Sequence, residues 1–320
     1  VNSKQGREVI ASLLGIYVFV AIFWMLWDQG NGNTLTLQAQ SSLMDKDLGF
    51  GLVLLPAQLQ VVNGLFILGL VPIFTYGVYP FVAKFTKVTP LRKIGAGLFV
   101  MGASFFIVAM IEKRIMAGEV VSAWWQIFAY LILTAGEVLV SITALEFSYK
   151  QAPLTMKSFI MGLFLFSTTL GNLGIAAVNS AMVRPLQASN IEVGAETWVA
   201  LPDVAEFQRG QKLDVTGDNG VFLPNDKDGK PVKLNGTFLI ADIDAAGKRL
   251  RLMDAVDRKP LVTSGSFNAA KAEVSTYWLV GPNYFYFFIG VVFVAGLIFI
   301  AYAMRYKERD FVRTDGAASA

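Results

Sequence analysis

Long apolar runs separated by short polar segments dominate the hydrophobic pattern of this chain. Six runs come near the roughly 20 residues that a helix needs to cross the hydrocarbon core of a bilayer. They occupy residues 9–27, 61–83, 94–111, 124–147, 159–183 and 284–302. Pro72 lies inside the second run and predicts a kink there. The pattern predicts an all-α polytopic membrane protein with six membrane-spanning helices.

The connection over residues 184–282 breaks this pattern, because it holds 13 of the 24 acidic and 12 of the 27 basic residues. Residues 237–244 and 248–253 flank Ala245-Ala246-Gly247 and predict a β-hairpin. Residues 225–229 add a turn that resembles half a calcium loop, although the acid needed at its twelfth position is missing. We expect a small β-rich extracytoplasmic insert. A spacer without a binding role is the alternative.

Basic residues set the orientation, since cytoplasmic loops of membrane proteins are rich in lysine and arginine. With the N-terminus inside, the inside segments carry Lys4, Arg7, Lys84, Lys87, Arg92, Lys93, Lys150, Lys157, Arg305, Lys307, Arg309 and Arg313. The short outside segments carry Lys46, Lys113 and Arg114. Both ends are therefore expected in the cytoplasm, and residues 184–282 in the periplasm or outside the cell.

The composition excludes several kinds of catalytic and metal-binding site. Charged residues make up 16% of the chain, against about 25% in soluble proteins. The chain has no cysteine and no histidine, which excludes thiolate nucleophiles, histidine triads, disulfides and Cys/His zinc sites. A net charge of +3 without a basic, aromatic-interleaved block gives no reason to expect nucleic acid as a partner. We expect a membrane protein that is not an enzyme and that uses no metal or cofactor, with carboxylates carrying any proton chemistry.

The chain begins at Val1 in a polar lead, with no secretory signal peptide before the first apolar run. We expect a fragment or a processed chain.

Glu137 is the strongest functional candidate, because an acid at membrane depth costs roughly 2.5–3.5 kcal/mol even on lenient insertion scales. At about 100° per residue it shares one helical stripe with other polar residues. This stripe consists of Gln126, Tyr130, Thr134, Glu137, Ser141 and Ser148. Such a stripe is expected to face a bundle interior or a wet cavity. The alternative is a structural stripe that hydrogen-bonds a neighbouring helix.

Weaker candidates lie in three other runs. The fifth run places polar residues and Phe164 on one face, with glycines that allow close helix packing. These residues are Phe164, Thr168, Asn172 and Asn179, with Gly162, Gly171 and Gly174 between them. In the first run Trp24 and Asp28 share a stripe with Tyr17, although both also suit an interfacial anchor. Asn63 lies near the outer end of the second run.

Four motifs together resemble the proton-dependent oligopeptide transporter family. They are FWMLWDQ (residues 23–29), LQVVN (residues 59–63), GEV with Ser141, Leu145 and Ala152-Pro153 (residues 136–153), and MGLF with LGN (residues 161–172). They resemble motifs of the family's seventh, eighth, tenth and eleventh helices, in that order. The resemblance covers all six runs but not residues 184–282.

This resemblance implies the C-terminal six-helix half of a twelve-helix major facilitator fold. It implies alternating-access symport of protons with di- and tripeptides, jointly with an N-terminal half that this chain lacks. By the same resemblance, Glu137 faces the peptide amino group and Asn63 contacts the peptide backbone. Trp24, Phe164 and Ser141 belong to the cavity wall. Asp28 is the family's proton-coupling or gating acid, and Glu137 shares in that coupling.

Two departures from the family pattern concern the site. Gly64 replaces the family's usual proline, and Phe164 replaces a common tryptophan, which alters the expected side-chain pocket.

The expected organisation has four parts. Residues 1–183 form five membrane helices, 184–282 the insert, 283–304 the last helix, and 305–320 a cytoplasmic tail. The expected setting is the bacterial inner membrane, with membrane lipid, small peptides, protons and the N-terminal half as partners. The alternatives are a major facilitator carrier of another solute, such as nitrate or a drug, and a membrane-anchored receptor or assembly subunit whose insert binds a partner.

Overall fold

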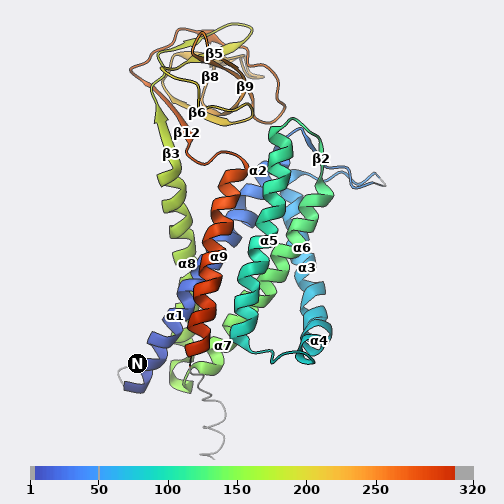
Figure 1. Cartoon of the computed structure of the whole chain (residues 1–320). Helices are drawn as coiled ribbons and strands as arrows, with labels where there is room; N and C mark the ends of the chain where they lie inside the picture. The colour runs from blue at the N-terminus through green and yellow to red at the C-terminus, as the bar shows by residue number, and fades with distance from the viewer. Residues whose placement is uncertain (1–3, 50, 307–320) are drawn as a thin grey trace, which may run out of the picture.

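The computed structural model describes residues 4–49 and 51–306, which form a helical bundle with a β-rich module at one end (Figure 1). Six helical stretches among these residues are long and apolar enough to cross a membrane, which confirms the six predicted spans. They are Arg7–Gln40, Pro56–Ala83, Pro90–Met116, Ala123–Gln151, Leu154–Met182 and Pro282–Arg305. Most of the predicted tail lies outside the described residues, from residue 307 onward.

Several spans are assembled from more than one kind of helix. Their α-helices are α1 (Lys4–Trp27), α2 (Leu35–Gln40), α3 (Val61–Pro72), α4 (Tyr79–Ala83), α5 (Pro90–Met116), α6 (Ala123–Glu137), α7 (Thr143–Gln151), α8 (Lys157–Met182) and α9 (Pro282–Arg305). Three π-helical segments join them, Asp28–Thr34, Ile73–Val78 and Val138–Ile142. Two 3₁₀ segments, Pro56–Gln60 and Leu154–Met156, precede α3 and α8.

The first span continues well beyond Trp27, where the sequence pattern predicted its end, and this boundary was wrong. The polar stretch Asp28–Thr34 reads as a loop because glycine and asparagine are poor helix formers. Tertiary contacts hold it in the helix instead. Asn179 Nδ2 of the fifth span donates to Gln29 Oε1 at 3.3 Å, and Gln126 Nε2 of the fourth donates at 2.7 Å to the carbonyl of Leu35, directly after the segment.

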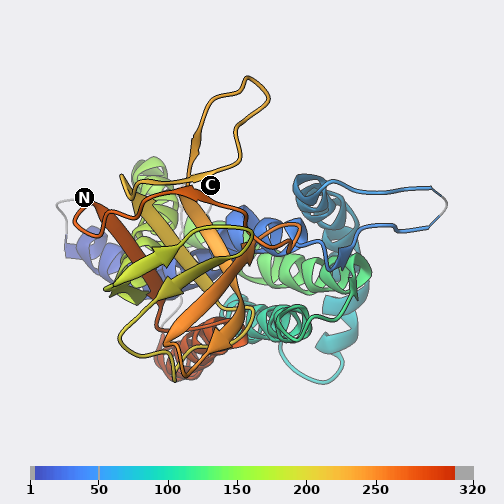
Figure 2. The same ribbon diagram turned by 90° about the horizontal axis from the view of Figure 1, so that it is seen from above.

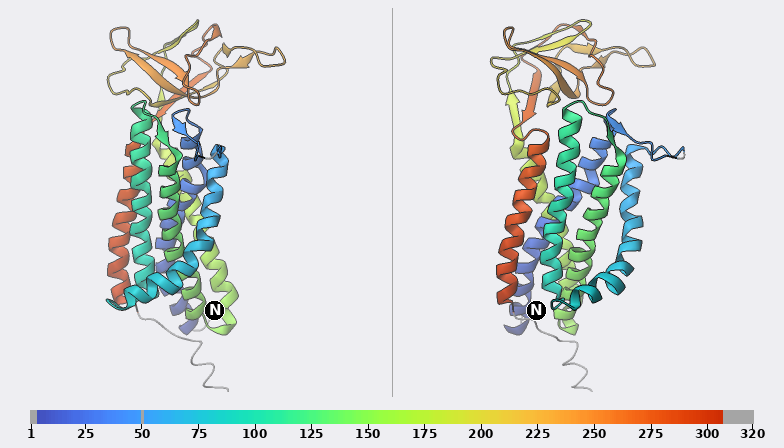
Figure 3. Two further views of the ribbon diagram at one scale, coloured as in Figure 1. Left: turned by 90° about the vertical axis from the view of Figure 1, so that its right-hand side faces the viewer. Right: turned by 45° about the vertical axis from the view of Figure 1, so that its right-hand side comes forward.

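The second span changes direction near Pro72, as predicted. α3 ends at this proline and the π-helical segment Ile73–Val78 follows. Figure 3 shows the chain bending between α3 and α4. A proline lacks an N–H and its ring clashes with the preceding turn, so the helix departs from α geometry there.

The bundle packs through a few close helix pairs. α1 lies against α8, α5 lies between α6 and α9, and α3 contacts chiefly α6. Glycines allow the closest approaches: a Cβ at Gly171 of α8 would lie 2.6 Å from the Ala21 carbonyl oxygen of α1. The core contains fully buried aromatic and branched side chains, including Phe23, Phe105 and Phe288.

The β-rich module has its own hydrophobic core and two sheets. The larger sheet is antiparallel, in the order β3 (Val183–Leu186), β12 (Ala272–Tyr277), β6 (Lys212–Gly217), β9 (Gly236–Asp244), β10 (Arg249–Asp254), β5 (Thr197–Ala200), β4 (Asn190–Glu192). The smaller one has the order β11 (Ser264–Gly265), β7 (Val221–Leu223), β8 (Val232–Lys233). β9 and β10 form the predicted hairpin, with Asp244 opposite Arg249.

Two strands connect the module to the bundle. β3 follows α8 directly and pairs with β12, and the Trp278 N–H donates to the Met182 carbonyl at 2.9 Å. The loop after β10 makes a second contact, because Arg258 Nη1 donates to the Ile115 carbonyl of α5 at 2.8 Å. Seen from above, α3 and α4 lie outside the area that the strands cover (Figure 2).

A short parallel pair links two loops at the module's end of the bundle. β1 (Met44–Asp45) pairs with β2 (Val121–Ser122). This pair ties the end of the first span to the start of the fourth.

Candidate functional site

Glu137 lies midway along the fourth span, where α6 gives way to the π-helical segment Val138–Ile142. Its side chain is half-buried. Asp28 occupies the corresponding place in the first span, as the first residue of its π-helical segment. Such segments are frequent at functional sites, because they re-aim side chains and widen the local backbone. Both acids singled out from the sequence therefore lie at irregular points of their helices.

Two donors from other spans hold the Glu137 carboxylate. Trp27 Nε1 donates to Glu137 Oε2 at 2.9 Å, and Asn63 Nδ2 donates to the same oxygen at 3.0 Å. Hydrogen bonds to charged groups contribute about 1.5–3 kcal/mol each. The carboxylate thus joins the first, second and fourth spans at mid-membrane, while neither of these two bonds uses Oε1.

Asn63 is itself fixed by a second contact. Its Nδ2 also lies 3.0 Å from Thr134 Oγ1, and that hydroxyl donates to the Tyr130 carbonyl one turn earlier. Thr134 is fully buried and Asn63 almost so. The predicted amide of the second span therefore meets the polar stripe of the fourth.

The polar stripe faces the bundle interior along much of its length, as predicted. Gln126, Tyr130, Thr134 and Ser148 are all buried. At the module's end of the bundle Gln126 binds the first span, and at the opposite end Ser148 donates to its own helix at the Ala144 carbonyl. The structural interpretation thus describes Gln126, which bonds a neighbouring span, whereas this bond of Ser148 is within its own helix and Thr134 belongs to the Glu137 cluster.

Asp28 lies close enough to Glu137 for the two carboxyl groups to interact electrostatically. The Asn172 side chain of α8 hydrogen-bonds to Asp28. Asp28 Oδ2 is buried without a hydrogen-bond partner among the described residues, and Trp24 Nε1 is in the same state. Unpartnered buried polar groups are rare and call for an explanation. Here two of them, on Trp24 of α1 and on Asp28 of the π-helical segment, lie about one helical turn apart in the first span.

Two further predicted residues lie away from these contacts. Phe164 is buried between α8 and α1, where its ring packs edge-on against Tyr17 at 6.1 Å between centroids. Ser141 is half-buried within the π-helical segment that follows Glu137. Their roles toward a ligand stay predictions.

Some site residues were missed from the sequence. Trp27 looks like an interfacial tryptophan at the end of an apolar run, but it donates to Glu137. Gln29 and Tyr284 were also missed, and they join the predicted Asn179 in a chain near the module's end of the bundle: the Tyr284 hydroxyl donates to Asn179 Oδ1 at 2.8 Å, and Asn179 Nδ2 donates to Gln29 Oε1 at 3.3 Å. The spacing from Trp24 to Trp27 was the available signal, because residues three apart share a helix face.

Among the described residues no three histidine, cysteine, aspartate or glutamate side chains gather as a metal site would require. In the turn that resembles half a calcium loop, Asp226 Oδ1 accepts hydrogen bonds from the backbone N–H groups of Asp228 and Lys230. The turn's own backbone therefore occupies this carboxylate oxygen. The Glu137 cluster can bind a cation through its carboxylate or exchange a proton there.

Comparison with known proteins identifies the family to which this helical arrangement belongs. The family model described as the POT family matches residues 2–199, more than half of the chain. The chain belongs to the POT family. The match covers the first five spans together with Glu137, Asp28 and Asn63.

Curated relatives are similar over the same region. Peptide transporter PTR2 of Saccharomyces cerevisiae is 29% identical over 199 residues, which is 58% of this chain and 32% of the relative. Solute carrier family 15 member 2 of Danio rerio is 36% identical over 113 residues, 35% of this chain and 15% of the relative. Protein NRT1/PTR FAMILY 4.3 of Arabidopsis thaliana is 27% identical over 213 residues, 64% and 35% respectively. The chain thus spans about a third of the length of the yeast and Arabidopsis relatives.

Two solved structures are similar in fold. The in meso crystal structure of the POT family transporter PepTSo has a TM-score of 0.51 at 38% identity, covering 55% of this chain and 34% of that one. A crystal structure of an auto inhibited POT family peptide transporter has a TM-score of 0.58 at 23% identity, covering 96% of this chain and 43% of that one. The second likeness, of fold only, extends through the β-rich module.

Proposed function

We propose that this chain is one half of a carrier that moves di- and tripeptides together with protons across a membrane by alternating access. The observation that carries the proposal is the Glu137 carboxylate, held at mid-membrane by Trp27 and Asn63 from two other spans. Membership of the POT family and relatives named as peptide transporters support it. The two acids carry different parts of the mechanism.

Glu137 is the group that binds the peptide amine. Its Oε2 is occupied by two donors, so Oε1 is the oxygen that an ammonium group would approach. A cationic partner favours the ionised carboxylate, and protonation weakens the contact and promotes release. Asn63 contacts the peptide backbone, and Trp24, Phe164 and Ser141 shape the wall around the ligand.

Asp28 is the proton-coupling group, with Glu137 sharing in the relay. An ionised carboxylate with an unpartnered buried oxygen is costly inside a membrane span, and Asp28 Oδ2 is such an oxygen. This cost supports Asp28 as the acid that takes up and releases a proton during the cycle.

The chain corresponds to the C-terminal half of a major facilitator fold, and its partner is an N-terminal six-helix half. Residues 1–183 and 283–304 supply the six spans, and residues 184–282 form the extracytoplasmic module. α3 and α8 support this arrangement, because both expose apolar side chains such as Leu68 and Leu165 that another helix or lipid would cover. The N-terminus, the tail over residues 305–320 and the basic loops lie in the cytoplasm. The proposed location is the bacterial inner membrane.

Substituting Glu137 in the complete transporter tests the substrate site. Glu137→Gln keeps the shape of the side chain but removes its charge, so dipeptide binding is expected to weaken at least tenfold in calorimetry. The matched control is Glu146→Gln, which changes an exposed acid of the same span. Unchanged dipeptide binding by Glu137→Gln would remove the assignment.

A separate substitution tests the proton role of Asp28. Asp28→Asn cannot release a proton, so uptake driven by a proton gradient is expected to fall at least tenfold while peptide exchange without a gradient continues. Both are measured in proteoliposomes with radiolabelled dipeptide. Intact gradient-driven uptake would contradict the role.

The same proteoliposomes separate a carrier of another solute from a peptide carrier. A peptide carrier should show uptake that unlabelled dipeptides compete away.

Deleting the module tests the receptor alternative. The Trp278 and Met182 backbones lie in hydrogen-bond contact, so a short glycine–serine linker can join α8 to α9. A carrier keeps uptake at saturating peptide after this deletion, whereas a receptor loses its partner.

A further inference from the structure

A cavity of about 490 Å³ lies where the β-rich module meets the outer ends of the helices. Its floor is formed by the outer parts of the first, third, fifth and sixth spans, and its roof by β6, β9, β12 and the loop after β10. Its volume is within the range of about 300–1,000 Å³ that is usual for small-molecule sites. Glu137, Asn63 and Asp28 do not line it, so it is distinct from the mid-membrane site.

Charges of opposite sign face this cavity from its two walls. Glu112 of α5 contributes a carboxylate from the helical side, where Gln38 Nε2 donates to Oε2 at 2.8 Å. Two cationic residues of the module, the exposed Lys212 of β6 and Arg258, line the other wall. None of these three charged side chains forms an ion pair with any part of the chain that the structure describes.

The position of Arg258 is fixed by a contact of its own. Its Nη1 donates to the Ile115 carbonyl rather than to Glu112, although the two charges interact through space. Burial lowers the pKa of Arg258 from its ordinary value and the Glu112 carboxylate acts in the opposite direction. An arginine remains charged in either case. The cavity therefore holds a fixed cation and a fixed anion that have not neutralised each other.

The rest of the wall is apolar or neutral. Leu37, Met116 and Val256 line it beside the amide chain that runs from Gln29 to Asn179. A simple anion in this cavity would meet Glu112, and a simple cation would meet Lys212 and Arg258. A molecule with an ammonium group at one end, a carboxylate at the other and a variable middle satisfies both walls, and a short peptide has this form.

We propose that this cavity is an outer peptide-binding site, in which Glu112 receives the peptide ammonium group and Lys212 and Arg258 receive its carboxylate. The choice of peptide as the ligand class rests on the proposed function. Gln29, Asn33 and Thr34 of the π-helical segment also line the cavity. A peptide held here contacts the same irregular turn of the first span that begins with Asp28.

The test uses trialanine and the complete transporter carrying Glu137→Gln, in which the mid-membrane site is disabled. Calorimetry is expected to show remaining, weaker trialanine binding. Adding Glu112→Gln or Lys212→Gln should reduce this remaining affinity at least tenfold. The matched controls are Glu119→Gln, in the loop after α5, and Lys233→Gln, on β8 of the module, which alter exposed charges outside the cavity. They should leave it unchanged.

A second readout separates loss of a contact from loss of folding. N-acetyl-trialanine, which lacks the ammonium group, should bind the Glu137→Gln protein poorly because its end meets the Glu112 carboxylate without a compensating charge. Adding Glu112→Gln should abolish this discrimination, so that trialanine and N-acetyl-trialanine bind equally. A misfolded variant would not gain affinity for the acetylated probe relative to trialanine.

The possible outcomes distinguish failure of the outer site from failure of the proposed transport function. If Glu137→Gln binds no trialanine while the unaltered transporter still takes up peptides, the outer site is overturned and the transport function stands. Remaining binding that neither Glu112→Gln nor Lys212→Gln affects also overturns the outer site. If the unaltered transporter neither binds nor takes up peptides, the proposed function itself fails.

Discussion

At the scale of single residues, the orientation of the Glu137 carboxylate is set by hydrogen-bond donors that come from other spans. Trp27 and Asn63 are far from it in sequence, and each belongs to a different span. A half-buried carboxylate with two donors on one oxygen is oriented as well as stabilised, because both bonds fix the same oxygen and neither involves the other. The tryptophan is thus as important to the site as the acid.

Removing the Trp27 donor tests this arrangement. Trp27→Phe keeps an aromatic ring but loses Nε1, and a hydrogen bond to a charged group contributes about 1.5–3 kcal/mol. Dipeptide affinity in the complete transporter is expected to fall by about tenfold or more, as measured by calorimetry. Trp125→Phe, at an exposed position of the same bundle, should bind normally. Equal affinities for both variants would show that Trp27 does not position the carboxylate.

At the scale of secondary-structure elements, close helix pairs and π-helical segments together determine where Asp28 and Glu137 lie. α1 and α8 approach so closely at Gly171 that a Cβ there would lie 2.6 Å from the Ala21 carbonyl oxygen and 2.8 Å from the Met25 nitrogen. These are backbone atoms, which cannot move aside as a flexible side chain would. The approach sets the position of α1 around Trp24, four residues before Asp28.

A pair of glycine substitutions on α8 tests this helix contact. Gly171→Ala is expected to destabilise the chain by about 1–3 kcal/mol, the usual cost of overpacking, despite alanine's better helix propensity. Gly162→Ala should be neutral or slightly stabilising, because a Cβ there meets no atom within 4 Å. Thermal unfolding in detergent compares the two. An unchanged melting temperature for Gly171→Ala would contradict the close contact.

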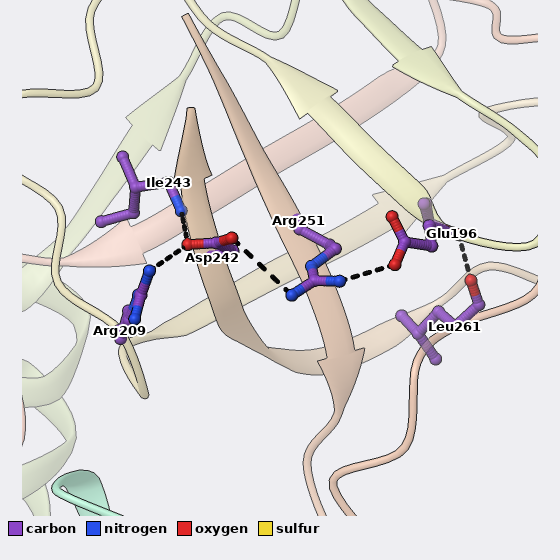
Figure 4. A network of polar contacts seen from close by, with 7 residues as sticks. Glu196, Arg209, Asp242, Ile243, Arg251 and Leu261 are labelled. Carbon is purple, nitrogen blue, oxygen red and sulfur yellow. Dashed lines mark hydrogen bonds and ion pairs between the residues drawn. The ribbon is translucent and has the colours of Figure 1, made fainter. Parts of the chain in front are cut away.

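At the scale of the whole molecule, different interactions stabilise the bundle and the module. The bundle interior is mostly apolar, whereas the module carries a ladder of ion pairs across β9, β10 and Glu196, which directly precedes β5 (Figure 4). Asp242 contacts Arg209 and Arg251, and Arg251 Nη1 lies 2.6 Å from Glu196 Oε1. Backbone N–H of Ile243 and then the Arg209 side chain lower the pKa of the Asp242 carboxyl below its usual value.

Acid should therefore affect the module before the bundle. A carboxyl whose pKa is lowered in the folded protein stabilises the fold above its unfolded pKa of about 4, and this stabilisation is lost as the pH falls below that value. The melting temperature of the strand signal in circular dichroism is expected to fall as the pH drops from about 4 to about 2, and this fall should be smaller in Asp242→Asn. Asp203→Asn, outside the ladder, serves as the control. A melting temperature that does not change with pH would contradict the expectation.

The sequence predicted the six spans, the hairpin of the module and the acid at mid-membrane, because each depends on local patterns. An apolar run of about 20 residues has few stable conformations other than a membrane helix, and alternating residues around Ala245-Ala246-Gly247 favour a hairpin. The extension of the first span through Asp28–Thr34 was not predictable in this way. Distant side chains contact this stretch, as Asn179 does at Gln29 and Gln126 at the adjoining Leu35.

The sequence by itself determined which segments enter the membrane and which acid lies at its centre, since both follow from the free energy of moving residues out of water. The tertiary structure decided that Trp27 and Asn63 share one oxygen of Glu137. It also decided that Glu112 and Arg258, 146 positions apart by their numbers, face one cavity. Hydrogen bonds and charge pairs act over a few ångströms, and the packing of helices and strands alone brings these groups within that range.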